Sequence, residues 1–194
     1  MERPQLILAS ASPRRLALLA QIGLTPLRVL PAEIDESADE SELPRAHALR
    51  IAIQKARTVK SRLSSEDSAV ILAADTVVAC GRRILPKAED DGTVTKCLKL
   101  LSGRRHTVYT SIAIIDGDGK LHTRISETKL AFRRLDAKEI ADYVKTGEGL
   151  GKAGGYAIQG RAAIYVRFMG GSYSNVVGLP LLETFQLLRS CGVA

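Results

Sequence analysis

The sequence contains no tryptophan and is poor in cysteine, histidine and aromatic residues. Among 194 residues there are three cysteines, three histidines and 4% aromatic residues. Cys80, Cys97 and Cys191 lie far apart, with no C-x-x-C pair and no histidine at metal-ligand spacing. We therefore expect reduced core thiols rather than disulfides or a zinc site. The histidines are equally scattered, so any chemistry is expected to depend on carboxylates, lysine and arginine.

Long apolar segments are also missing. The apolar stretch at 69–80 contains Asp75 and falls far short of the roughly 20 residues that a membrane helix needs. The start of the chain lacks the apolar region and cleavage site of a signal peptide. We expect a cytoplasmic protein without a membrane partner. The hydrophobic content of 45% can fill an aliphatic core. No repeat or linker divides the chain, which predicts a single domain over residues 1–194.

The formal charge of +7 favours an anionic partner. The arginines occur as dispersed pairs, without a long basic run or the interleaved aromatic residues that stack single-stranded bases. A small phosphorylated ligand fits this pattern better than a nucleic acid. Arg82–Arg83, Arg104–Arg105 and Arg133–Arg134 are interpreted as solvating turns. A nucleic-acid-binding protein is the weaker alternative, and it predicts binding that weakens steeply with salt.

Hydrophobic periodicity and turn residues predict alternating strands and helices. Strands are expected over 5–9, 25–30, 69–80, 84–85, 107–115 and 121–132, near Tyr156, and over 163–169. Helices are expected after Ser12 to about 23, from a cap at Ser41 to about 64, and over 90–101, 136–147 and 180–191. The turn at 116–119 predicts a hairpin. This order favours an α/β protein with a mixed sheet.

The first candidate site is the segment from Ser10 to Arg15, at a strand-to-helix junction. Ser12 can cap the helix, and Pro13 suits its first position because the missing N–H is not needed there. The free amides and the positive end of the helix dipole favour an anion. Arg14 and Arg15 add guanidinium groups that match phosphate oxygens in bidentate geometry. Capping alone also explains the Ser-Pro pair, but the arginines favour phosphate binding.

The second candidate is Asp75, inside the almost continuously apolar strand at 69–80. A buried carboxylate is costly unless it is paired, hydrogen-bonded or bound to a metal. A structural partner would be sufficient, but the position favours a metal ligand or general base. Thr76 should point to the opposite face of a regular strand. Glu36, Lys55 and Lys87 carry little weight individually, because exposed glutamate and lysine are common.

Four segments in collinear order closely resemble the Maf family of nucleotide pyrophosphatases. These are 6–15 (LILASASPRR), 74–78 (ADTVV), 152–160 (KAGGYAIQG) and 171–180 (GSYSNVVGLP). The resemblance implies a mixed α/β fold with an elongated, twisted sheet flanked by helices, and two lobes around a central cleft. The family is similar in architecture to the inosine triphosphate pyrophosphatases. It is usually dimeric, which implies a homodimer, and it uses a divalent cation such as Mg²⁺, with Mn²⁺ or Co²⁺ as alternatives.

The resemblance also implies an activity and its catalytic residues. The chain would hydrolyse a nucleoside triphosphate to the monophosphate and pyrophosphate. Asp75 would be the proton acceptor, with Glu36 and Asp75 at the metal and the attacking water. Lys55 and Lys87 would neutralise phosphate charge. A non-enzymatic nucleotide-binding regulator of septum formation is the alternative, because the family is associated with inhibition of cell division.

Substrate-binding residues follow from the same resemblance. Ser10, Arg14 and Arg15 would contact the phosphates. Arg14, Thr76 and Gln159 would set specificity, because the segments that carry them are similar to the branch that hydrolyses dTTP and UTP, with CTP or modified pyrimidine nucleotides also in range. The amide of Gln159 can donate to and accept from a pyrimidine edge. The chain departs from the family at Pro86–Ala88 and at Gly149–Gly151, where other residues are usual.

Overall fold

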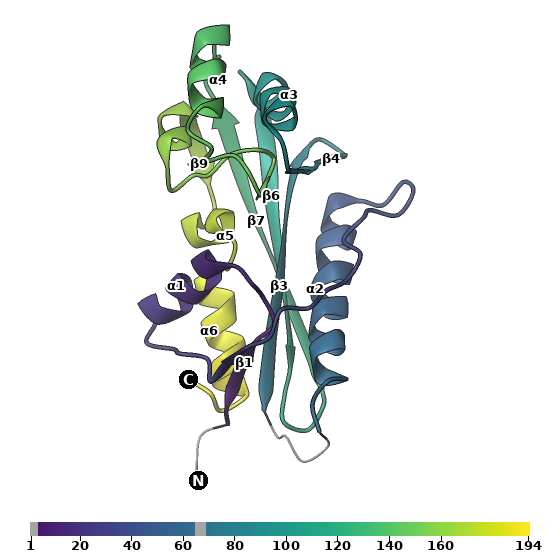
Figure 1. Ribbon diagram of the computed structural model, residues 1–194. Helices are drawn as coiled ribbons and strands as arrows, with labels where there is room; N and C mark the ends of the chain where they lie inside the picture. Colours follow the sequence, from purple (N-terminus) through teal and green to yellow (C-terminus); the bar gives the residue numbers. More distant parts are fainter. Residues whose placement is uncertain (1–3, 65–68) are drawn as a thin grey trace.

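The computed structural model describes residues 4–64 and 69–194 (Figure 1). Residues 1–3, where the sequence indicates no signal peptide, lie outside these ranges. The strands are β1 Leu6–Leu8, β2 Arg28–Val29, β3 Val70–Cys80, β4 Arg83–Leu85, β5 Lys87–Ala88, β6 Arg105–Ile115, β7 Leu121–Phe132, β8 Lys152–Ala153 and β9 Val166–Gly170. The helices are α1 Pro13–Gln21, α2 Pro44–Lys60, α3 Asp91–Leu101, α4 Ala137–Val144, the 3₁₀ helix η1 Arg161–Tyr165, α5 Tyr173–Val177 and α6 Leu181–Ser190.

One mixed sheet runs the length of the molecule. Its strand order is β2-β1-β3-β6-β7-β9, and β4 pairs with β3. β1 is parallel to β2 and β3, whereas β3–β6, β6–β7 and β7–β9 are antiparallel. The long strands β3, β6 and β7 extend through both halves of the elongated molecule (Figure 1). The mixed α/β fold with flanking helices that the sequence predicts is therefore confirmed.

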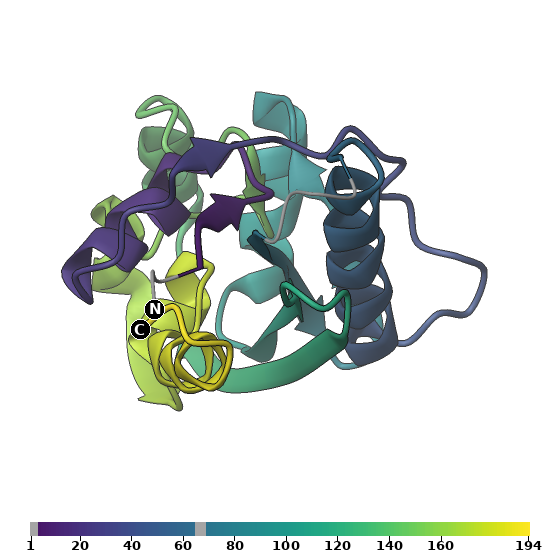
Figure 2. The ribbon, with the colours of Figure 1, turned by 90° about the horizontal axis from the view of Figure 1, so that it is seen from below.

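Helices cover both faces of this sheet, and the side chains of β3 alternate between them. Val70, Leu72 and Ala74 belong to the larger apolar core, on the side of α1 and α6. Ile71 and Ala73 belong to a smaller core under α2. Figure 2 shows α2 on one side of the strands and α1 and α6 on the other. Alternation therefore decides which helix each polar residue of β3 faces.

The helix α2 begins later and ends earlier than the sequence predicts. Its N-cap is Leu43, with Pro44 in the first turn, and the helix ends at Lys60 rather than near residue 64. The prediction that Ser41 caps this helix is wrong. Ser41 has a φ of 63° and lies in a turn, so its hydroxyl does not occupy the extended conformation of a capping residue.

Several short elements also differ from the predictions. Only Arg28–Val29 of the strand predicted at 25–30 is formed. Tyr156 lies after a two-residue strand rather than within one. The strand predicted at 163–169 begins as the 3₁₀ helix η1 and pairs only from Val166. The sequence did not predict α5, whose five residues are too few for a periodic signal.

Other predictions are confirmed. β6 and β7 form the predicted hairpin, and Asp136 with Glu139 forms a complete capping box at α4. The three cysteines are free, although only Cys97 is buried. No helix in the described ranges is both long enough and apolar enough to cross a membrane.

A buried asparagine fixes α5 to the sheet. Asn175 is fully buried, and its Nδ2 donates hydrogen bonds to the carbonyl oxygen of Val108 at 3.1 Å and to Oγ1 of Thr128 at 2.9 Å. The backbone carbonyl oxygen of Asn175 accepts from Oγ1 of Thr110 at 2.9 Å. Because α5 is too short to be stable by itself, these bonds set its position.

We predict that Asn175→Ala destabilises the protein by about 1–3 kcal/mol, because Val108 and Thr128 lose a buried donor. Urea denaturation at pH 7 measures this change. The matched control is Arg167→Ala on the exposed edge of β9, which should leave the midpoint nearly unchanged. Equal midpoints for the wild type and Asn175→Ala would show that α5 is held by other contacts.

Candidate active site

A cleft of about 1070 Å³ opens beside the middle of β3. Its walls come from both halves of the chain, including the β1–α1 junction, the loop before α2, the β4–β5 segment and the turn after β8. All nine residues predicted from the sequence line it: Ser10, Arg14, Arg15, Glu36, Lys55, Asp75, Thr76, Lys87 and Gln159. The fold therefore brings them together, whereas their individual roles stay predictions.

Lys55 links the two predicted metal-site carboxylates. Its ammonium group lies 2.8 Å from Oδ1 of Asp75 and 2.7 Å from Oε1 of Glu36. The side chains of Lys55 and Asp75 are each only 9% exposed, whereas that of Glu36 is 47% exposed. The charge of Asp75 is thus compensated inside the fold, as a buried carboxylate requires.

The pKa of Glu36 reflects this pairing. Burial disfavours the ionised carboxylate, but the hydrogen bond from Lys55 and the charges of Lys55, Lys87 and Arg15 outweigh burial and lower the pKa. Glu36 is therefore ionised at neutral pH. It faces a cleft whose lining contains more lysine and arginine side chains than carboxylates.

Two carboxylates that share the Lys55 ammonium group in this cleft suit a hard divalent cation. Mg²⁺ takes oxygen ligands and is commonly held by one or two carboxylates together with phosphate oxygens and water. Glu36 and Asp75 supply such oxygens, and Oδ2 of Asp75 accepts no hydrogen bond from any described residue. The donor set at this place in the cleft therefore fits a magnesium-like ion bound jointly with a polyphosphate.

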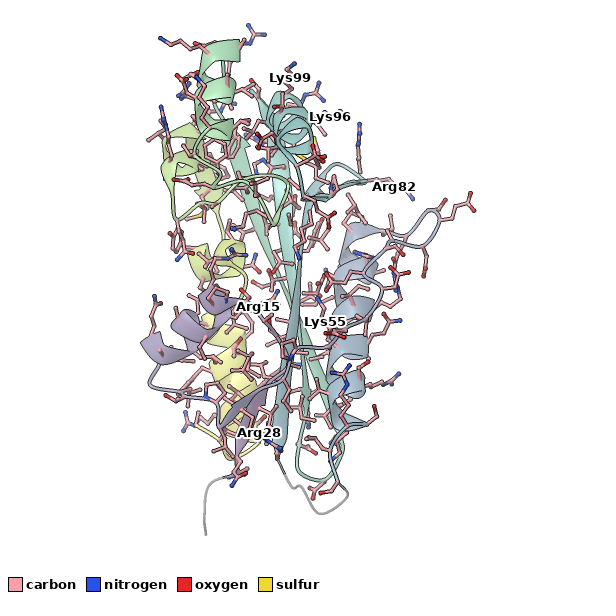
Figure 3. All side chains as sticks on the ribbon, viewed as in Figure 1. Arg15, Arg28, Lys55, Arg82, Lys96 and Lys99 are labelled. Carbon is pink, nitrogen blue, oxygen red and sulfur yellow. The ribbon has the colours of Figure 1, made fainter. Side chains whose placement is uncertain are left out.

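Arg15 lies on the opposite side of β3 from Lys55 (Figure 3). Its Nη1 donates to Oγ of Ser10 at 2.9 Å, its Nη2 to Oγ1 of Thr76 at 3.3 Å and its Nε to the carbonyl oxygen of Gly178 at 2.8 Å. All these acceptors are uncharged. In the part of the chain that the structure describes, no carboxylate lies within salt-bridge distance of the guanidinium group.

The guanidinium group of Arg15 is therefore fixed in position but not neutralised by direct contact. Burial lowers its pKa, and the nearby charge of Arg14 acts in the same direction, while Asp75 raises it. A buried arginine remains protonated even so. Its charge is available to an anion in the cleft. Because three hydrogen bonds already hold the side chain, binding of the anion would cost little additional conformational entropy.

The prediction that Ser12 caps α1 with its side chain is wrong. Ser12 is the N-cap residue by its backbone, but its hydroxyl makes no capping hydrogen bond. The N–H of Arg15, which such a cap would bind, instead donates to the carbonyl oxygen of Ser12 at 3.2 Å. The first turn thus lacks a side-chain acceptor, which leaves the positive end of the helix open to a ligand.

Two further cations reach the cleft from a small second sheet. β5 pairs with β8, so that Lys87 lies opposite Ala153, and Ala88 lies opposite Lys152. Burial lowers the pKa of Lys152, and the charges of Arg14 and Lys87 lower it further. The convergence of these cations on one cavity has an electrostatic cost that a bound anion relieves. The sequence had not placed Lys152 in the site.

This ladder also joins the two segments where the chain departs from the Maf pattern. The N–H of Gly151 donates to the carbonyl oxygen of Ala88 at 2.7 Å, and that of Gly154 donates to Pro86 at 3.0 Å. Ala88 is fully buried. The two segments that differ from the Maf pattern are therefore joined by the β5–β8 ladder, and Lys87 in this ladder still lines the cleft.

The three residues predicted to set specificity occupy different environments. Thr76 is tied to the fold, because its Oγ1 lies 3.0 Å from Oγ1 of Thr110 and accepts from Arg15. Asp75 and Thr76 face opposite sides of β3, as the strand alternation predicts. Arg14 is half-buried, and burial lowers its pKa. Gln159 is exposed at the turn before η1.

The loop that carries Glu36 is held by a network that the sequence did not predict. Glu42 accepts hydrogen bonds from Nε and Nη2 of Arg50 at 2.8 and 2.7 Å and lies 2.8 Å from Nδ1 of His47. Arg50 also donates to the carbonyl oxygen of Ser37 at 2.9 Å, next to Glu36. This network fixes the loop to α2, about one to two helical turns before Lys55.

Comparisons with known proteins identify the family of this chain. The family model described as Maf-like protein matches residues 5–191. A dTTP/UTP pyrophosphatase of Caulobacter vibrioides is 56% identical over 97% of this chain and 96% of its own length. A dTTP/UTP pyrophosphatase of Paramagnetospirillum magneticum is 57% identical over 97% of this chain and 98% of its own length.

A solved structure supports the architecture alone. A HAM1 protein from Coxiella burnetii is 16% identical to this chain, with a TM-score of 0.50 over 96% of this chain and 98% of that one. At this identity the likeness concerns the fold and not the residues of the cleft.

The network around Glu42 predicts a pH-dependent stability. Hydrogen bonds from Arg50 lower the pKa of Glu42 from 4.5 to about 2. Because the folded state depresses this pKa, the stabilisation is present above pH 4.5 and is lost as the pH falls toward 2. Glu42→Gln should lower stability at pH 7 and flatten its decline on acidification, as measured by urea denaturation at a series of pH values.

The control for this prediction is Glu40→Gln, on the exposed part of the same loop. It should leave both the stability at pH 7 and its slope nearly unchanged. If Glu42→Gln showed the same slope as the wild type, other carboxylates would account for the acid sensitivity.

Proposed function

The chain belongs to the Maf family, and we propose that it is a nucleoside triphosphate pyrophosphatase that hydrolyses dTTP and UTP. CTP and modified pyrimidine nucleotides are further candidate substrates. The products are the nucleoside monophosphate and pyrophosphate. The observation that carries the proposal is a single cleft in which Lys55 links two carboxylates, while the fixed guanidinium group of Arg15 has no carboxylate partner among residues 4–64 and 69–194. The names of the near-full-length relatives support the choice of substrate.

The triphosphate binds where the cations converge. Arg15 and Arg14 offer guanidinium groups at the open end of α1, and Ser10 holds Arg15 in place. Lys87 and Lys152 approach the same cavity from the β5–β8 sheet. Since hydrogen bonds set the position of the Arg15 guanidinium group before the ligand arrives, little binding energy is spent on ordering it.

Asp75 acts as the proton acceptor in the chemical step. A water molecule attacks the α-phosphorus, its proton passes to the carboxylate of Asp75, and the bond between the α-phosphorus and the bridging oxygen breaks. Pyrophosphate leaves with the electron pair of that bond. Lys55 holds Oδ1 of Asp75 through the 2.8 Å contact, so that Oδ2 is the oxygen directed to the water. Positioning and charge neutralisation supply most of the acceleration, as in phosphoryl transfer generally.

Glu36 and Asp75 are the residues that would hold a divalent cation, with Mg²⁺ as the first candidate and Mn²⁺ or Co²⁺ as alternatives. When bound, this ion supplies Lewis acidity to the phosphate oxygens. Glu36 is well placed for a ligand that comes and goes with the substrate, because it is more exposed than Asp75. Lys55 contacts both carboxylates and lowers the pKa of Glu36.

Base recognition is assigned to the exposed turn that carries Gln159. Its amide supplies one donor and one acceptor direction, which a pyrimidine edge can match. Thr76 contributes indirectly, because its hydroxyl is already bonded to Arg15 and Thr110. It sets the position of Arg15 relative to the nucleotide.

The family resemblance further implies that the protein acts as a homodimer. The lack of long apolar segments and the dispersed arginine pairs favour a cytoplasmic protein that binds neither nucleic acid nor membranes. A regulator of septum formation that binds nucleotide without hydrolysing it is the alternative function. Turnover separates the two, because the regulator needs the binding cleft but not the chemistry at Asp75.

The experiment that tests the proposal is pyrophosphate release from a panel of canonical and modified nucleoside triphosphates with Mg²⁺. Release from dTTP and UTP, little release from purine nucleotides and complete loss with chelator are expected. A chain that binds these nucleotides but releases no pyrophosphate from any of them would support the regulator instead.

Removal of the proton acceptor should separate binding from turnover. Asp75→Asn keeps the size of the side chain and a contact to Lys55, so the fold should persist while kcat falls by about 10²–10⁴. The control is Asp142→Asn on α4, at the surface. A kcat for Asp75→Asn within a few-fold of the wild type would mean that another group accepts the proton.

Gln159→Ala should lower kcat/KM for dTTP and UTP by about tenfold, which corresponds to about 1.4 kcal/mol of hydrogen bonding to the base. Hydrolysis of a purine triphosphate, which does not use this contact, should change less. Gln21→Ala at the exposed end of α1 is the matched control. An unchanged ratio of pyrimidine to purine kcat/KM would exclude Gln159 as a specificity residue.

A further inference from the structure

Three potential metal ligands from distant parts of the sequence meet at one end of the sheet. Asp116 follows β6, His122 lies near the start of β7, and Cys191 is the C-cap residue of α6. A carboxylate oxygen, an imidazole nitrogen and the Cys191 sulfur all lie within 4.8 Å of one another. Within residues 4–64 and 69–194, this is the one group of three such side chains.

Each side chain is half-buried, which suits a bound ion that still exchanges with solvent. The side chains of Asp116 and His122 are 18% and 24% exposed, and Cys191 packs against the edge of the larger core. Two strands and a helix terminus carry them, so the three groups approach one point from separate elements. A chance contact between neighbours in sequence would not join the hairpin to the C-terminal helix.

The hydrogen bond between two of the ligands accounts for only part of the arrangement. Nε2 of His122 lies 2.6 Å from Oδ2 of Asp116, while Oδ1 of Asp116 accepts from the backbone N–H groups of Asp118 and Lys120 in the hairpin turn. These contacts explain an aspartate and a histidine at the hairpin. They do not explain a thiol directed at the same point, which adds the soft ligand of a transition-metal site.

We propose that Asp116, His122 and Cys191 form a binding site for Zn²⁺ or a similar transition-metal ion, separate from the cleft. The ion takes the place of the proton shared by His122 and Asp116 and binds the thiolate of Cys191, with water as the fourth ligand. The proton displaced from Nε2 of His122 is carried on Nδ1 instead, and the thiol proton is released to solvent. One aspartate, one histidine and one cysteine favour zinc over magnesium, which takes oxygen ligands.

Small side-chain movements complete the geometry. Tetrahedral zinc with bonds of about 2.0–2.3 Å separates its ligand atoms by about 3.3–3.8 Å. The imidazole and carboxylate must therefore move apart by about 0.7 Å from their 2.6 Å contact, and the sulfur, which lies within 4.8 Å of both, must approach by no more than about 1.3 Å. The two backbone N–H groups that donate to Oδ1 of Asp116 hold this carboxylate, so the imidazole and the thiol would make most of the movement.

The site is distant from the chemistry. Asp75 pairs with Ser111 on β6, and Asp116 lies five residues further along, which places it roughly 17 Å away at about 3.4 Å per residue. The metal would fasten the end of α6 to the β6–β7 hairpin. It would raise stability without entering the reaction of the cleft.

Cobalt absorption tests this site directly, because Co²⁺ bound to a thiolate gives an intense charge-transfer band, whereas Co²⁺ bound to carboxylates does not. The chelator-treated chain is titrated with CoCl₂ under a phosphine reductant. We expect a thiolate band that saturates at one equivalent and disappears when Zn²⁺ is added. Absence of the band in the wild type would overturn the proposal.

Cys191→Ser should abolish the band, and His122→Gln should weaken Co²⁺ binding at least tenfold. The matched controls Cys80→Ser and Cys97→Ser should retain it, since both cysteines lie outside the group. Zn²⁺ should raise the melting temperature of the wild type but not of Cys191→Ser, and Mg²⁺-dependent pyrophosphate release should be equal in the two. A band that persists in Cys191→Ser would refute the assignment.

Discussion

The alternation of side chains along β3 is the constraint on which the site depends. Asp75 and Thr76 are adjacent in sequence but face opposite sides of the strand. One side receives Lys55 from α2, and the other receives Arg15 from α1. On one side of this strand, Lys55 is paired with two carboxylates. On the other side, Arg15 is hydrogen-bonded only to uncharged oxygens. Insertion of one residue into β3 would exchange the two environments and destroy both.

As a result, the charges on the two sides of β3 differ in how fully the fold compensates them. The contacts of Lys55 compensate Asp75 within the fold, so that part of the site contributes to the native state before any ligand binds. Arg15, Arg14, Lys87 and Lys152 are brought near one another with less compensation, and burial lowers the pKa of three of them. A polyphosphate supplies the missing negative charge. The fold holds these cations close together against their mutual repulsion. A polyphosphate relieves that repulsion, and this contributes to its affinity.

Features with strong local signals could be predicted from the sequence, whereas those set by distant contacts could not. The apolar run interrupted by Asp75 and the capping box at Asp136 are readable because a few neighbouring residues determine them. The conformation of Ser41 could not be predicted, because the network that joins Glu42 to Arg50 fixes its loop. The short helix α5 likewise depends on the contacts of Asn175 with β6 and β7. Lys152 was missed because its approach to Lys87 depends on a two-residue ladder.

The length of the central strands also limits how the cleft can change shape. β3, β6 and β7 contain 11, 11 and 12 residues and are paired along nearly their whole length. The continuous hydrogen-bonded ladder of these strands passes beneath the cleft, so the two halves of the molecule are joined by a stiff sheet and not by a flexible hinge. A movement of the two cleft walls relative to one another must twist this sheet, and the energetic cost is shared by many hydrogen bonds. The positions of the cleft walls relative to one another are therefore set largely by this sheet, and not by a linker between separate units.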